Sequence, residues 1–319
     1  MYYVGIDLGG TNISTAVVNE NYEILGRGKL KTNLPRSAAE IADDMASSVL
    51  MACSEANIDL ADVESVGIGA PGSVNAETGI IEFSNNLKFD NVPLIKMMEN
   101  RLSVRCFMEN DANAAAYGEL LAGAGKGATN FVAITLGTGV GGGIIIDGKI
   151  YSGSNYCGAE LGHTCMVFEG VDCNCGRKGC FEVYASATAL INQTKAKMLV
   201  SENSKMWALT NGDINEASGR TAFDAMRQGD TAATEVVEMY FKYLGCGLVN
   251  MINIFQPEFI CIGGGISNEG ETILAPLRKY IEKERYSKYS KKQTELCIAK
   301  LGSDAGIIGA AMLHNLYNK

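Results

Sequence analysis

The sequence predicts an α/β protein in which a βββαβαβα unit occurs twice, giving two lobes around a cleft, with an insertion that carries a cysteine cluster. Two glycine-rich strand–turn–strand segments support this, "YVGIDLGGT" from Tyr3 and "FVAITLGTG" from Phe131. Each runs into two further apolar strands and then into alternating helical and strand patterns. Internal similarity of this kind indicates a fold built from copies of one unit.

The first half begins with three predicted strands, "YVGIDL", "ISTAVV" and "EILGRGKL". A helix follows Ser37, because "SAAE" is a capping box and Ile41, Met45 and Val49 fall on one helical face. Strand "VESVGIGA", helix "PLIKMMENRL", strand "VRCFM" and helix "ANAAAYGELLAG" complete the unit.

The second half repeats this order more loosely. Its strands are "FVAITL", "GIIID" and "KIYSG", and they precede helices near residues 183–196 and 235–255. Strand "EFICIG", a helix from Gly270, strand "ELCIAK" and helix "AGIIGAAMLHNLY" end the chain. We expect a smaller lobe of residues 1–117 with 305–319 and a larger lobe of residues 118–304.

Composition disfavours several classes of protein. The chain has 319 residues with 47% hydrophobic and 20% charged residues, a globular balance that leaves little room for long disorder. The net charge of -9, without a basic face, disfavours nucleic-acid binding. Neither a signal peptide nor a membrane span is predicted, so we expect a cytoplasmic protein. In that reducing compartment most of the 10 cysteines are expected to be core thiols, and only a tight cluster suggests a metal site.

The glycine-rich turns are candidate phosphate sites, since N–H groups in tight turns form concave anion sites. "GTGVGG", from Gly137, fits G-x-G-x-x-G, but a strand follows it where a dinucleotide site needs a helix. For a single turn of this kind, a plain β-hairpin without a ligand is the alternative. The presence of two matching turns favours phosphate binding over that alternative. Asp7 ends the first strand beside one turn and is suited to holding Mg²⁺ through water. "FICIGGGIS" is either a tight turn or a backbone shelf for adenosine.

The stretch "CNCGRKGC" follows C-x-C-x₄-C, and His163 lies ten residues before its first cysteine. Cys173 and Cys175 cannot easily form a relaxed disulfide with each other, and three cysteines leave an odd one. Three thiolates and an imidazole complete a tetrahedral zinc site, with buried core thiols as the alternative. Four protein ligands close the coordination shell, so the expected zinc is structural.

Asp111 stands before the alanine-rich helix in "MENDANAAAYGE". A helix cap by Asn110 or Asp111 is the alternative to a catalytic function, and the two are compatible. We expect the positive helix end to keep Asp111 ionised at neutral pH.

Three motifs, "DLGGTN", "LGTGVGGG" and "IGGGIS", resemble the phosphate-1, phosphate-2 and adenosine motifs of the sugar kinase/Hsp70/actin superfamily, whose fold is ribonuclease H-like. With "GAPGSV", "MENDANAAAYGE", "ELGH" and "CNCGRKGC", the whole chain is similar to the ROK (repressor, open reading frame, kinase) family, and "EVYASATAL" especially to its bacterial glucokinases. The family often has Trp where this chain has Phe89.

The resemblance implies an ATP-dependent kinase for the 6-hydroxyl of glucose, with Asp111 as the base. The alternatives are N-acetylmannosamine, N-acetylglucosamine, mannose, fructose or allose as substrate, a non-catalytic sugar sensor, or a repressor, which would need a helix-turn-helix domain ahead of the strand at Tyr2. The implied sugar contacts are Asn86, Asn110, Asp111, Glu160, His163 and Glu182. The implied ATP and Mg²⁺ residues are Asp7, Gly9, Gly10, Thr11, Asn12, Gly137, Thr138, Gly139, Gly264 and Gly265. The zinc ligands are His163, Cys173, Cys175 and Cys180. A homodimer or higher homo-oligomer is expected from the family.

Overall fold

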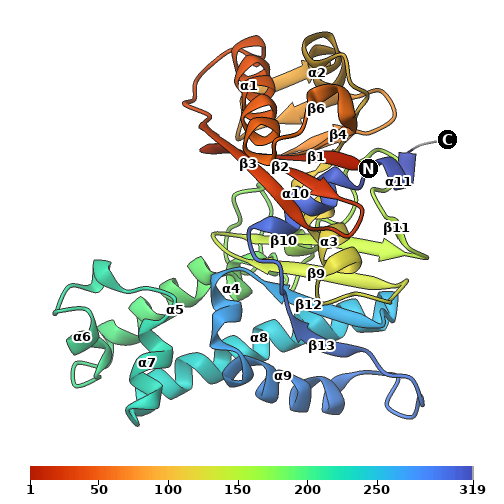
Figure 1. Cartoon of the computed structure of the whole chain (residues 1–319). Helices are drawn as coiled ribbons and strands as arrows, with labels where there is room; N and C mark the ends of the chain where they lie inside the picture. Colours follow the sequence, from red (N-terminus) through yellow and green to blue (C-terminus); the bar gives the residue numbers. More distant parts are fainter. Residues whose placement is uncertain (318–319) are drawn as a thin grey trace. The chain divides into compact units, whose positions relative to one another are not determined.

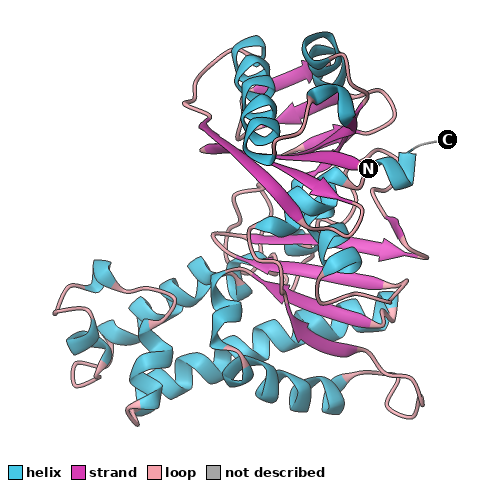
Figure 2. Ribbon diagram, viewed as in Figure 1, coloured by secondary structure: helices cyan, strands magenta, loops and turns pink. Residues whose placement is uncertain are grey.

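Two five-stranded sheets and one three-stranded sheet form the frame of the computed structural model, which describes residues 1–317 (Figures 1 and 2). The strands are β1 (Tyr2–Leu8), β2 (Asn12–Asn19), β3 (Ile24–Lys31), β4 (Val63–Ala70), β5 (Ser73–Asn75), β6 (Ile80–Ser84), β7 (Phe89–Val92), β8 (Cys106–Asn110), β9 (Phe131–Leu136), β10 (Val140–Ile146), β11 (Lys149–Ile150), β12 (Phe259–Gly263) and β13 (Glu295–Ile298). The α-helices are α1 (Ala38–Ala56), α2 (Leu94–Leu102), α3 (Asp111–Ala122), α4 (Glu182–Ala185), α5 (Ala187–Leu199), α6 (Met206–Leu209), α7 (Thr221–Arg227), α8 (Thr231–Phe255), α9 (Glu271–Glu284), α10 (Asp304–Ala311) and α11 (His314–Tyr317).

The two larger sheets have corresponding strand orders. The first runs β3-β2-β1-β4-β8, with β1 antiparallel to β2 and parallel to β4, and with β4 parallel to β8. The second runs β11-β10-β9-β12-β13, with an antiparallel β10–β11 pair and a parallel β12–β13 pair. The prediction of an α/β fold is therefore confirmed, with mixed sheets.

Most predicted elements are present, with differences in the second half. The helix expected over residues 183–196 is divided at Ser186, whose extended backbone and side-chain bond to the Ala189 N–H start a new helix. The last predicted helix is likewise two, α10 and α11, and the strand "KIYSG" is reduced to the two residues of β11. None of the helices in residues 1–317 combines the length and the apolar character needed to cross a bilayer.

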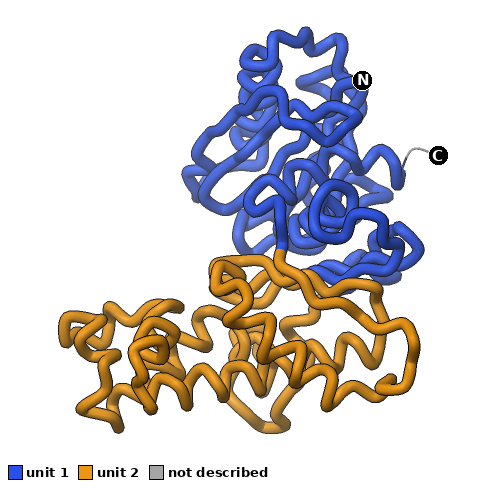
Figure 3. The backbone as a smooth tube through the Cα atoms, turned by 60° about the horizontal axis from the view of Figure 1, so that its bottom comes forward, with its two compact units in different colours: residues 1–133, 143–159, 299–319 blue, residues 134–142, 160–298 orange. Residues whose placement is uncertain are grey.

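The described chain divides into two units, which Figure 3 distinguishes by colour. The first comprises residues 1–133, 143–159 and 299–319, and the second residues 134–142 and 160–298. The lobe boundaries expected from the sequence, residues 1–117 with 305–319 and residues 118–304, stay a prediction.

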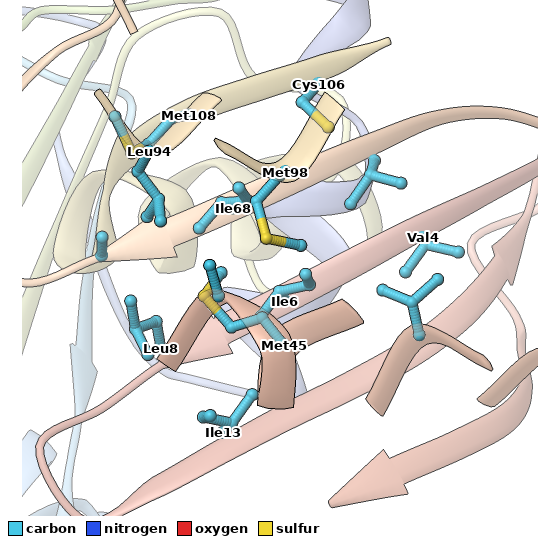
Figure 4. Packing of buried hydrophobic residues seen from close by; sticks show 14 of the residues in the cluster. Val4, Ile6, Leu8, Ile13, Met45, Ile68, Leu94, Met98, Cys106 and Met108 are labelled. Atoms are coloured by element: carbon cyan, nitrogen blue, oxygen red, sulfur yellow. The ribbon is translucent and has the colours of Figure 1, made fainter. Parts of the chain in front are cut away.

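The core of the first unit lies between its sheet and the helices α1 and α2 (Figure 4). Ile6 and Ile68 of the sheet and Met45 of α1 are fully buried there. Burying one such side chain stabilises the fold by about 1.5–3 kcal/mol relative to exposing it. The capping box predicted at Ser37 is confirmed, with Ser37 and Glu40 bonded to each other's backbone N–H, so α1 starts where the sequence indicates.

Helix α10 packs directly on the first sheet and on α3. A side-chain carbon at Gly5 of β1 would lie 1.9 Å from the carbonyl oxygen of Ile307, and one at Gly309 would lie 1.7 Å from that of Ala114. Only glycine permits such backbone contact. The C-terminal segment is therefore an integral part of the first unit.

Candidate functional site

Two aspartates come together at one edge of the first sheet. Asp7 lies near the end of β1, and Asp111 directly follows β8 as the first residue of α3. Because β1, β4 and β8 are parallel, their carboxyl ends meet at this edge, where α/β proteins bind ligands. Gly69 of the intervening β4 has no side chain to separate the two residues, and a carbon added there would lie 3.6 Å from the Cα of Asp111.

The environment of this pair opposes negative charge. Burial, and then repulsion from Asp111, raises the pKa of Asp7 to about 6. Burial also raises the pKa of Asp111, although the Ala112 N–H acts in the opposite direction. The N–H groups at the helix start thus lower the pKa of Asp111, as expected, but burial raises it by more. Two desolvated carboxylates at one sheet edge fit a site for Mg²⁺, whose preferred ligands are oxygens.

Asn110 is the cap of α3. Its side-chain oxygen accepts hydrogen bonds from the N–H groups of Ala112, at 2.9 Å, and Asn113, at 3.3 Å. Its side-chain nitrogen donates to the Gly72 carbonyl at 3.2 Å. The capping alternative is correct for Asn110, and it fixes the backbone from which the Asp111 carboxylate projects.

Glu109, the residue before Asn110, is missing from the sequence-based site. It is 0% exposed, and its two carboxylate oxygens accept four hydrogen bonds. The donors are the Asn110 N–H, the Asn113 side chain, the Ser152 hydroxyl and the Tyr317 hydroxyl. Its position inside "MENDANAAAYGE" at the end of a buried strand was the available signal, since a buried carboxylate needs dedicated donors.

The turn between β1 and β2 contains Gly9, Gly10 and Thr11. The Gly9 N–H donates to the Asn12 carbonyl at 2.9 Å, and the Thr32 hydroxyl donates to the Gly9 carbonyl at 2.7 Å. The structure brings Asn86 to this turn, because a carbon added at Gly10 would lie 3.8 Å from the Asn86 Cβ. The side-chain oxygen of Asn12 is buried without a partner. A carbonyl oxygen of this kind accepts hydrogen bonds, so it suits a donor group or a cation, whereas a phosphate group would be bound by the N–H groups of the turn.

A second glycine turn, Gly137 to Gly139, joins β9 and β10 in the second unit. The space above Gly137 is open to 4 Å, whereas a carbon added at Gly139 would lie 2.1 Å from Glu182 Oε2. That same carboxylate oxygen accepts the Val140 N–H at 2.8 Å. Glu182 therefore supports the turn that contains Thr138, a connection that the sequence did not reveal.

The adenosine-like segment follows β12. Gly264 has a φ of +86° and lies against β9, where an added carbon would be 2.3 Å from the Leu136 carbonyl oxygen. Gly265 has nothing within 4 Å of the corresponding position. The segment is thus packed against β9 at Gly264 and open at Gly265, and the shelf for adenosine stays a prediction.

The four predicted metal ligands converge. One ligand atom from each of His163, Cys173, Cys175 and Cys180 lies within 4.8 Å of all the others. The Cys175 and Cys180 sulfurs are 3.7 Å apart, and His163 Nδ1 is 3.6 Å from the Cys173 sulfur. Zn–S bonds of about 2.3 Å in a tetrahedron put two sulfurs about 3.8 Å apart, so the cluster fits zinc.

Two carboxylates flank this cluster. His163 Nε2, the nitrogen turned away from Cys173, lies 4.0 Å from Glu160 Oε2, and the Glu160 side chain is 67% exposed. Glu182 Oε1 lies 3.9 Å from the Cys173 sulfur. Glu160 and Glu182 therefore lie beside the candidate metal site, of which His163 is part. A metal bound there would fix the positions of these two carboxylates, which are acceptors suited to hydroxyl groups.

Comparisons with known proteins agree with this geometry. A model of the ROK family matches residues 3–316. A glucokinase of Thermotoga maritima is 38% identical, with 97% of this chain and 96% of that protein covered. A glucokinase of Halalkalibacterium halodurans is 36% identical, with 98% and 94% covered. The crystal structure of a ROK family glucokinase from Streptomyces griseus, in complex with glucose and AMPPNP, is 36% identical, covers 98% of this chain and 99% of that one, and has a TM-score of 0.80.

Proposed function

Because the chain belongs to the ROK family, we propose that it is a glucokinase, which transfers the γ-phosphoryl group of ATP to the 6-hydroxyl of glucose. The observation that carries this is the full-length similarity to bacterial glucokinases, at 36–38% identity, in a chain that retains Asp7, Asp111 and both glycine turns. A non-catalytic sensor would have no need of the paired carboxylates at the sheet edge.

In the proposed reaction Asp111 is the base. It accepts the proton of the 6-hydroxyl as that oxygen forms a bond to the γ-phosphorus, and the bond from phosphorus to the β–γ bridging oxygen breaks to release ADP. The transition state is loose, so orientation of the hydroxyl contributes more than basicity. The burial of Asp111 and the capping of its helix by Asn110 support this role, because both restrict the carboxylate.

The remaining predicted residues divide into three proposed groups. Sugar hydroxyls are bound by Asn86, Asn110, Glu160, His163 and Glu182. ATP is bound at Gly9, Gly10, Thr11, Asn12, Gly137, Thr138, Gly139, Gly264 and Gly265, and Asp7 holds Mg²⁺ through water. Mg²⁺, when bound, would neutralise charge on the phosphates. The open space above Gly137 and Gly265 supports the nucleotide assignment.

We further propose that His163, Cys173, Cys175 and Cys180 bind a structural zinc ion within an insertion, which fixes Glu160 and Glu182. The corresponding orders of the two larger sheets support a duplicated βββαβαβα fold of the ribonuclease H-like kind. A cytoplasmic homodimer or higher homo-oligomer is the expected form.

A coupled assay of ADP release over a panel of hexoses tests the function. We expect ADP formation to depend on glucose, and ³¹P NMR to identify glucose 6-phosphate. Asp111→Ala should lower kcat by about 10²–10⁴-fold with a much smaller change in the KM for glucose. Asp59→Ala is the matched control, because Asp59 also accepts a neighbouring N–H, that of Ala61, at a helix start on the surface.

Each adverse outcome has a distinct meaning. Turnover that survives Asp111→Ala within a few-fold would show that Asp111 is not the base. A higher kcat/KM for N-acetylmannosamine or another hexose would replace glucose as the substrate while the kinase assignment stands. A wild type that releases no ADP with any hexose would contradict the kinase assignment.

A further inference from the structure

We propose that Glu109 is the residue that positions Asp111 and that Tyr317, at the C-terminal end of the chain, acts on the reaction through Glu109. The inference rests on the proposed function and adds to it two residues outside the proposed sugar and nucleotide contacts. Both residues lie in the first unit, as do all the groups that they contact.

The Oε1 atom of Glu109 holds the segment on both sides of Asp111. It accepts the Asn110 N–H at 2.8 Å and the Asn113 side-chain nitrogen at 3.1 Å. Asn110 precedes Asp111, and Asn113 lies in the same first turn of α3. A single buried oxygen therefore holds residues on both sides of the proposed base, Asn110 before it and Asn113 after it.

The Oε2 atom of Glu109 faces the rest of the unit. It accepts the Tyr317 hydroxyl at 2.6 Å and the Ser152 hydroxyl at 3.1 Å. Both donors come from distant segments, 208 and 43 positions away in the chain. Burial and the negative charge of Glu109 raise the pKa of Tyr317, which keeps its hydroxyl protonated and donating.

All four contacts of Glu109 are donors, which suits a carboxylate with its four acceptor positions filled. Bonds to a charged acceptor in a buried site are the strong class of hydrogen bond. With fewer donors, Glu109 would have to turn to recover a partner, and Oε1 would move with it. Loss of the Tyr317 hydroxyl should therefore displace Asp111 through Glu109, although Tyr317 lies on a different helix, α11.

The test is a set of steady-state measurements on Tyr317→Phe, Glu109→Gln and the double variant, with thermal unfolding to confirm that each is folded. A misplacement of about 1 Å costs about a hundredfold in rate, so we expect Glu109→Gln to lower kcat about a hundredfold and Tyr317→Phe, which loosens one bond, about tenfold. The KM for ATP should stay within about twofold, since the proposed phosphate turns are not involved.

Tyr156→Phe is the matched control. It removes a bond from a tyrosine hydroxyl to a glutamate in the same unit, here the exposed Glu77 at 2.8 Å, and it should leave kcat unchanged. The double variant provides the readout that a purely structural role would not move: adding Tyr317→Phe to Glu109→Gln should lower kcat by less than about threefold, because the two residues act along one path.

Two results would overturn the inference: an active wild type whose kcat survives Tyr317→Phe within twofold, or single-variant effects that multiply fully in the double variant. If Tyr317→Phe is unfolded at the assay temperature, Ser152→Ala, which removes the other donor to Oε2, takes its place with the same expectation. A wild type without kinase activity would overturn the proposed function as well, so the two failures are distinguishable.

Discussion

Replacing Asp7 by Asn should make the ligand-free protein more stable while it impairs the reaction. In the folded chain, burial and the neighbouring Asp111 raise the pKa of Asp7 to about 6, from 3.8 for a free side chain. Folding therefore disfavours the ionised form. The neutral amide of Asn has nearly the same size and avoids this cost, and it also removes the repulsion acting on Asp111.

The magnitude follows from the pKa difference. A rise of the pKa from 3.8 to about 6 corresponds to about 3 kcal/mol at pH 8, where Asp7 is ionised in both the folded and the unfolded chain. Between pH 3.8 and about 6 the folded state binds more protons than the unfolded state, so the stability of the wild type falls as pH rises through this window and then levels off. The advantage of Asp7→Asn should accordingly be about 3 kcal/mol at pH 8 and about half of that at pH 5.

Urea unfolding at pH 8 and pH 5, in buffer without Mg²⁺ or nucleotide, measures this difference. Asp90→Asn, which changes an exposed aspartate of β7, is the control and should stay within about 0.5 kcal/mol of the wild type. The same Asp7→Asn protein should lose most of its kcat/KM for MgATP, since a neutral amide binds Mg²⁺ poorly. An Asp7→Asn protein no more stable than the wild type, or stabilised equally at both pH values, would refute the reasoning.

Two further predictions concern the second unit. Protein purified without chelator should contain one zinc per chain, as measured by elemental mass spectrometry. Cys175→Ser should reduce the zinc content and lower the Tm, because zinc binding contributes to folding. Full zinc content in Cys175→Ser would contradict the proposed ligand set. Gly137→Ala should raise the KM for ATP and leave the free energy of unfolding within about 1 kcal/mol, because the added methyl group meets no protein atom but occupies space assigned to phosphate. An unchanged KM for ATP in Gly137→Ala would count against the turn as a phosphate site.

Local sequence signals predicted several features that depend on local interactions. The capping box at Ser37 predicted the start of α1, and the glycine turns and the cysteine spacing predicted features that the structure contains. The division at Ser186 was missed, because a serine side chain that bonds a backbone N–H three residues later can begin a new helix within an otherwise helical pattern. The three-stranded sheet β5–β7 was also missed, since its short strands carry little periodic signal.

The site was predictable to the extent that its residues stand in motifs. Asp7, Asp111 and the cysteines do so, whereas the donors to Glu109 come from Ser152 and Tyr317, far away in the chain. Electrostatics were the other gap: the helix start at Asp111 could be identified, but the extent of its burial could not, and burial is the larger influence on its pKa.

The glycine contacts between α10, β1 and α3 bear on the order of events during translation. Domains generally fold in the order in which they leave the ribosome. Here the first strands emerge early, yet the helix that covers them belongs to residues 304–311 and is synthesised near the end. The first part of the nascent chain therefore cannot complete the packing of its sheet until translation is nearly finished, although α3 already covers part of β4 and β8. A premature stop codon near the 3′ end of the coding region would leave this early part of the fold incomplete.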